Sequence, residues 1–87
     1  MQFRWPPSAQ PMTRITPVQY RKIVGVLELE GFVLARQRGD HMVFVKAGIE
    51  RPVVVPRYDP LPVFIIKNVL RTARISRERY FELLEGI

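Results

Sequence analysis

The chain has 87 residues, 47% of them hydrophobic, and a formal net charge of +6. This length leaves room for one small domain with a limited core. The sequence has no cysteine, which excludes a disulfide framework and a thiolate metal site, and no apolar run reaches the ~20 residues of a membrane helix. Because the first residues also lack the apolar segment of a signal peptide, we expect a soluble, cytoplasmic protein with no membrane contact.

The positive charge is concentrated in one part of the chain. Residues 31–77 contain nine Lys and Arg against three acidic residues, so this segment accounts for the whole net charge. Arginine outnumbers lysine 11 to 3, and its planar guanidinium suits phosphate oxygens. A polyanion such as nucleic acid is therefore favoured as a partner. A basic surface that serves only solubility remains the alternative.

Residues 1–12 hold three prolines and no periodic pattern, so we expect a disordered lead before one domain at 13–87. Thr16-Pro17-Val18-Gln19 is typical of a capping box, with Thr16 as the cap and Pro17 in the first helical position. The next apolar residues have helical spacing: Tyr20, Ile23, Val24 and Leu27. Gly31 then predicts the end of this first helix.

Three short strands are predicted next, at 32–37, 41–46 and 52–56, with turns around Gly39 and Gly48. Pro52 and Pro56 limit the third strand and indicate a sheet edge. A second helix is predicted at 62–74 and a third after Ser76 as its cap. Phe32, Phe44 and Phe64 are expected in the core. The prediction is an α+β fold in the order α-β-β-β-α-α, with a three-stranded antiparallel sheet and helices on one face.

His41 is the only histidine and opens the second predicted strand. A neutral imidazole can take a proton from an RNA 2′-hydroxyl, and nearby arginines such as Arg36 and Arg38 can stabilise the charge that develops on the phosphate. A histidine with no role beside a turn is the alternative. For Asp40 we expect a turn-capping role. One histidine and scattered carboxylates predict neither a metal site nor a cofactor site.

The sequence resembles the HicA (YcfA-like) family of bacterial toxins over about 13–84. The matching stretches are Gly31-Phe32, Arg36-Gln37-Arg38-Gly39-Asp40-His41, Val53-Val54-Val55-Pro56, and the run from Leu70 to Glu78. The resemblance implies a double-stranded-RNA-binding-like fold and an mRNA interferase activity. It also implies that His41 is the catalytic histidine and that a HicB-type antitoxin binds the protein and masks its active site.

Two positions depart from the family pattern. Asp40 replaces the usual serine before the histidine, and Pro62-Val63-Phe64-Ile65 replaces the usual entry to the second helix. Pro62 removes one backbone N–H donor at a helix start that could otherwise face phosphate. The first change removes any role of a hydroxyl at that position, and the second bears on substrate engagement and activity at the helix start.

Three functions therefore stay open from the sequence. The first is an endoribonuclease toxin that cleaves mRNA without metal, using His41 as general base. The second is a non-catalytic RNA-binding module, and the third is a subunit that binds mainly an acidic protein. The residues expected to contact RNA are Arg36, Arg38, Lys46, Arg57, Lys67 and Arg71, and Tyr58 is a further possible platform for base stacking.

Overall fold

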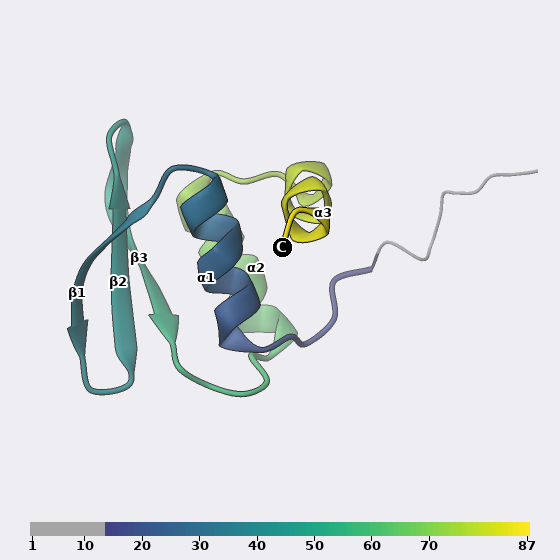
Figure 1. Cartoon of the computed structure of the whole chain (residues 1–87), viewed down its shortest axis with the longest axis horizontal. Coiled ribbons are helices and arrows are strands. Elements are labelled where there is room, and N and C mark those ends of the chain that lie inside the picture. Colours follow the sequence, from purple (N-terminus) through teal and green to yellow (C-terminus); the bar gives the residue numbers. More distant parts are fainter. Residues whose placement is uncertain (1–13) are drawn as a thin grey trace, which may run out of the picture.

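The computed structural model describes residues 14–87, and the predicted N-terminal lead at 1–12 lies outside them. The described elements follow in the order α1 (Tyr20–Leu29), β1 (Val33–Arg38), β2 (His41–Lys46), β3 (Ile49–Pro56), α2 (Val63–Ala73) and α3 (Arg77–Glu85) (Figure 1). The α+β class and the order α-β-β-β-α-α are therefore confirmed, and the arrangement is consistent with a double-stranded-RNA-binding-like fold. The single domain at 13–87 stays a prediction. Within the described residues, no helix is long and apolar enough to cross a membrane.

The sheet is antiparallel in the order β1-β2-β3, so β2 is central and β3 is an edge strand, as its prolines indicated. The predicted limits of β2 are confirmed. The predicted length of β3 is wrong, because this strand begins at Ile49 and contains Pro52. Its register with β2 shifts between Phe44 and Lys46. Pro52 is tolerated there because edge strands and bulges leave some N–H groups outside the ladder.

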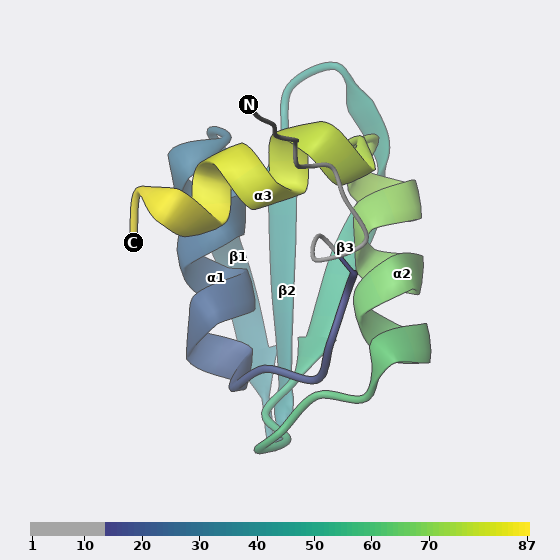
Figure 2. The same cartoon turned by 90° about the vertical axis from the view of Figure 1, so that its right-hand side faces the viewer.

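All three helices lie on one side of the sheet, with α1 and α2 at opposite sides of the view in Figure 2 and α3 across one end of both. The inner face of the sheet contributes Phe44, Val53 and Val55, each at most 1% exposed. They pack against the apolar stripe of each helix, and the cluster includes Ile23, Val26, Leu27, Ile66, Val69, Leu70, Ala73, Tyr80 and Leu83. Among residues 14–87, no helix lies on the opposite face of the sheet, which we call the helix-free face (Figures 1 and 2).

The expectation that Phe64 belongs to the core is wrong, because its side chain is 70% exposed. Phe64 lies two residues before Ile66, which places it about 200° around the helix from the buried stripe. Phe32 and Phe44 are buried as expected.

The predicted start of α1 is also wrong. The helix begins at Tyr20, and Thr16 and Pro17 lie outside it. The preceding Val18 is held in an extended conformation by an isolated bridge to Leu61, whose N–H donates to the Val18 carbonyl at 2.7 Å. An extended residue at this position cannot belong to the first helical turn, so the local capping signal is overridden by a tertiary contact.

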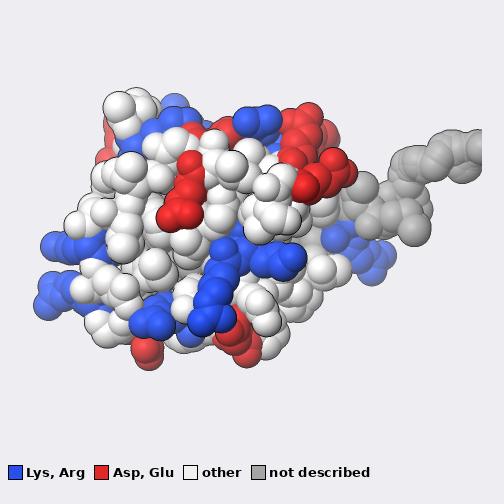
Figure 3. Space-filling view, viewed as in Figure 1, with Lys and Arg blue, Asp and Glu red and all other residues white. Residues whose placement is uncertain are grey.

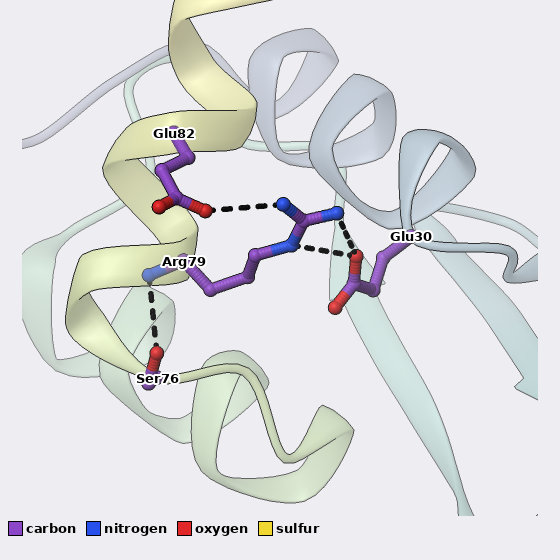
Figure 4. Close-up of polar contacts among 4 residues, drawn as sticks. All are labelled: Glu30, Ser76, Arg79 and Glu82. Carbon is purple, nitrogen blue, oxygen red and sulfur yellow. Dashed lines mark hydrogen bonds and ion pairs between the residues drawn. The ribbon is translucent and has the colours of Figure 1, made fainter.

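α3 is joined to α1 by Arg79 (Figure 4). Its guanidinium contacts the Glu30 carboxylate at 3.0 Å and Glu82 at 3.1 Å. The hydrogen bond to Glu30, and next that to Glu82, raise the pKa of Arg79 above its ordinary value. The Ser76 hydroxyl accepts a 3.0 Å hydrogen bond from the Arg79 N–H, which confirms Ser76 as the cap of α3.

Candidate nucleic-acid interface and catalytic histidine

His41 is the first residue of the central strand β2, and it is exposed. It lies opposite Arg38 on β1 and opposite Pro56 on β3. Pro56 has no N–H to donate, and the next residue, Arg57, donates its N–H to the Asp40 carbonyl at 2.7 Å. This hydrogen bond fixes the backbone immediately before His41. The exposed imidazole is therefore carried by a backbone segment that is hydrogen-bonded to the neighbouring strand's end.

Two of the predicted arginines share a sheet face with His41. Residues that are directly opposite on paired strands, and residues two apart on one strand, lie on the same face. Arg38 is opposite His41, and Arg36 is opposite Val43. Both arginines are exposed, and because their partners His41 and Val43 alternate along β2 with the buried Phe44, they lie on the helix-free face. The structure therefore places Arg36 and Arg38 on the same sheet face as the histidine, and their contact with RNA stays a prediction.

A groove of about 570 Å³ lies along the exposed edge of β3, where side chains of α2 on one side of the sheet meet side chains of the helix-free face such as Val54. His41 lines it together with Pro56, Tyr58 and Ile65. Its other lining residues are Arg51, Pro52, Val53, Val54, Asn68, Val69, Arg71 and Thr72. Because α2 follows β3 after one loop and lies along it (Figure 2), residues early in α2 are near the end of β3 and residues late in α2 are near its start. His41 therefore lies toward one end of the groove and Arg51 toward the other.

A second hollow of about 220 Å³ is lined by residues near the beginning of β3 and the end of α2. Arg51, Arg71 and Thr72 line both hollows, so the two are contiguous. Arg74 and Glu50 also line the second one. Three arginines and one carboxylate give this region a positive charge.

The other predicted RNA contacts are not gathered at the groove. Lys46 is at the opposite end of β2 from His41, with its Nζ 5.6 Å from the centre of the Phe32 ring. Arg57 donates from Nε to the Tyr20 hydroxyl at 3.3 Å, and its guanidinium lies over the same ring. Lys67 is exposed on α2 but does not line the groove. Of the predicted set, only His41 and Arg71 line it.

Sequence reasoning did not single out Arg51, Asn68, Thr72 or Arg74 as site residues. Asn68 accepts a 2.8 Å hydrogen bond from Nη1 of Arg71, which orients the guanidinium within the groove. Arg51 lies next to Pro52 in a stretch that the sequence predicted as a turn. It belongs instead to the edge strand β3, and this position, which the turn prediction concealed, brings it to the groove. Tyr58, considered as a stacking platform, is 46% exposed and lines the groove with His41.

The Asp40 side chain makes no hydrogen bond to another residue in the 14–87 range, so the predicted turn-capping role is not seen there. The Asp40 carbonyl accepts the 2.7 Å hydrogen bond from the N–H of Arg57. Among the same residues, no group of three or more His, Cys, Asp or Glu side chains could hold a metal ion.

Charge is distributed unevenly over the surface. Figure 3 shows many of the acidic side chains at the end of the molecule where α3 lies, whereas basic side chains project from the side of the sheet and also lie across the middle of this view. α3 contains Glu78, Glu82 and Glu85, whereas Arg36 and Arg38 belong to β1. The strands around His41 therefore carry basic side chains and lie away from the acidic residues of α3 (Figure 1).

A family model described as the HicA toxin of bacterial toxin–antitoxin systems matches residues 20–75. The match covers more than half of the chain and includes β1, β2, β3 and α2, which build the groove and carry His41. The chain belongs to the HicA toxin family. This HicA toxin is one component of a toxin–antitoxin pair, so an antitoxin is its partner. No curated protein matches the chain. α3 lies beyond the matched residues.

Proposed function

We propose that this HicA toxin is an mRNA interferase, an endoribonuclease that cleaves mRNA in the cytoplasm with His41 as general base and without a metal ion. The observation that carries the proposal is the position of His41. It is exposed at the end of β2, opposite Arg38, and it lines a groove that also contains two arginines. Membership in the HicA toxin family supports the same assignment.

The chemistry follows from these groups. The neutral imidazole of His41 takes the proton from a ribose 2′-hydroxyl, and the 2′-oxygen attacks the adjacent phosphorus. The bond from phosphorus to the 5′-oxygen breaks, the leaving oxygen takes up a proton, and a 2′,3′-cyclic phosphate remains. Arg38 stabilises the extra negative charge on the phosphoryl oxygens in the transition state. A positioned general base contributes roughly 10²–10⁴-fold to the rate.

We propose a HicB-type protein as the antitoxin. A partner that covers His41 and the groove would block RNA entry, which is the simplest way to neutralise the toxin. The helix-free face of the sheet offers Val33, Val45 and Val54 as exposed apolar side chains beside the arginines. An acidic partner with an apolar centre would complement this face.

The test compares RNA cleavage by the wild-type toxin and by His41→Ala, both in the presence of EDTA. The wild type is expected to cleave and the variant to lose at least about 100-fold in rate. Because His41 is exposed, His41→Ala should retain the thermal unfolding midpoint and the RNA affinity of the wild type. Equal cleavage by both proteins would refute the role of His41. Binding of RNA without cleavage by either protein would instead support a non-catalytic RNA-binding module.

A further inference from the structure

The groove contains more arginine than the reaction at His41 requires. Arg51 and Arg71 line both hollows, and Arg74 lines the second one beside them. The distance along β3 from Pro56, opposite His41, to Arg51 is ~17 Å at ~3.3 Å per residue. A stacked nucleic-acid strand rises about 3.4 Å per nucleotide, so this groove has the length for several nucleotides.

The cations in this region are free to bind an anion. Within residues 14–87, the ion pairs are those of Arg79 with Glu30 and Glu82, and neither involves the groove. The amide oxygen of Asn68 holds Arg71 without neutralising its charge. Glu50 also lines the second hollow. Within residues 14–87 it forms no ion pair with Arg51, Arg71 or Arg74.

Arg74 has an unusual backbone conformation for its residue type. It terminates α2 with φ 59° and ψ 41°, in the left-handed region, and the N–H of the following Ile75 donates to the Leu70 carbonyl at 2.9 Å. This is the position at which helices usually carry glycine, because a Cβ is unfavourable there. An arginine at this place lowers the stability of the helix end while adding a third cation to the second hollow.

We propose that Arg51, Arg71 and Arg74 form a phosphate-binding track that holds the RNA backbone on one side of the bond cleaved at His41. This inference rests on the proposed function, since it assumes that RNA enters the groove. The planar guanidinium groups bind phosphate oxygens through paired N–H donors, and Tyr58 lines the same groove near His41. RNA is favoured over an acidic protein segment as the occupant because the track leads directly to the histidine.

The experiment measures binding of a short, labelled single-stranded RNA of mixed sequence in a His41→Ala background, where cleavage does not interfere. Arg51→Gln, Arg71→Gln and Arg74→Gly are compared with Lys22→Gln, which removes a positive charge from exposed α1 and lines neither hollow. Each track variant is expected to weaken binding roughly 10-fold, since a hydrogen bond to a charged group is lost. The slope of log K against log salt is negative, and its magnitude should decrease by about 0.7 for each lost phosphate contact.

Arg74→Gly separates binding from folding. Glycine suits the left-handed conformation, so the thermal unfolding midpoint should equal or exceed that of the wild type while RNA affinity falls. The track would be refuted if the three variants bound RNA as Lys22→Gln does, or if they lost affinity only for an antitoxin. Weaker binding by Arg74→Gly together with a lower unfolding midpoint would also count against it. Because binding is measured without the histidine, failure of the track is distinguishable from failure of the cleavage proposal.

Discussion

The Asp59 carboxylate accepts a hydrogen bond of 3.2 Å from the backbone N–H of Tyr20, so the loop after β3 caps the first helix. The same loop is tied to the chain before α1 by the bridge between Leu61 and Val18. A third link is the 3.3 Å hydrogen bond from Arg57 to the Tyr20 hydroxyl. These three contacts fix the loop that connects β3 to α2. Because this loop carries Tyr58, which lines the groove near His41, the contacts define one end of the groove.

Replacing Asp59 with alanine is expected to lower the free energy of unfolding by about 1 kcal/mol, because the first turn of α1 loses its acceptor. Thr16→Ala is the matched control, since Thr16 lies outside the helix in the structure. It should change the free energy of unfolding by less than about 0.5 kcal/mol. Urea unfolding of both variants measures the difference. If Thr16→Ala lowered the free energy of unfolding more than Asp59→Ala does, Thr16 would be the cap of α1 in solution, as the sequence predicts.

Tyr80 is buried, at 1% exposure, and its hydroxyl is the buried side-chain polar atom without a hydrogen-bond partner among the described residues. Tyr80→Phe keeps the ring and removes the unsatisfied hydroxyl, so it is expected to raise the free energy of unfolding by about 1 kcal/mol. Chemical unfolding at neutral pH checks this. A clear loss of stability would show that the hydroxyl is satisfied in solution.

The same residue makes a prediction for alkaline pH. Burial raises the pKa of Tyr80 above its ordinary value of 10.0. Above pH 10 the unfolded chain therefore releases this proton while the folded protein retains it, and stability falls as the pH rises. Tyr80→Phe removes this contribution. The wild type should lose more stability than the variant between neutral pH and about pH 11, and parallel profiles would contradict the assignment.

Arg38→Gln is expected to reduce the rate of RNA cleavage about 10-fold, because Arg38 lies directly opposite His41 and, in the proposed mechanism, would stabilise the charge of the transition state. Lys46→Gln removes the same charge at the other end of β2, ~17 Å along the strand. At physiological ionic strength this exceeds the screening length of ~8 Å, so the cleavage rate should change little. Equal losses in the two variants would mean that the basic segment acts only through its total charge.

Several features follow from the local sequence because their signals lie within a few residues of one another. The turn at Gly39 and the apolar residues after it predict β2 with its correct limits. The apolar period within 62–74 predicts α2, whose buried residues are Ile66, Val69, Leu70 and Ala73. Ser76 predicts the start of α3, because an N-cap hydroxyl acts on an N–H only three residues away. The single histidine within a basic segment likewise indicates the candidate site.

Other features depend on contacts between distant segments. The start of α1 is decided by Asp59 and Leu61, which lie about forty residues downstream of the residues they contact. Phe64 is apolar, yet the orientation of α2 leaves it in solvent. The groove itself brings Arg51 of β3 to Arg71 and Arg74 at the end of α2. Hydrophobic periodicity locates buried residues and gives no information on where exposed arginines lie relative to one another. The sequence therefore determined how many positive charges the protein carries. Only the packing of α2 along the edge strand β3 decided which arginines lie close together.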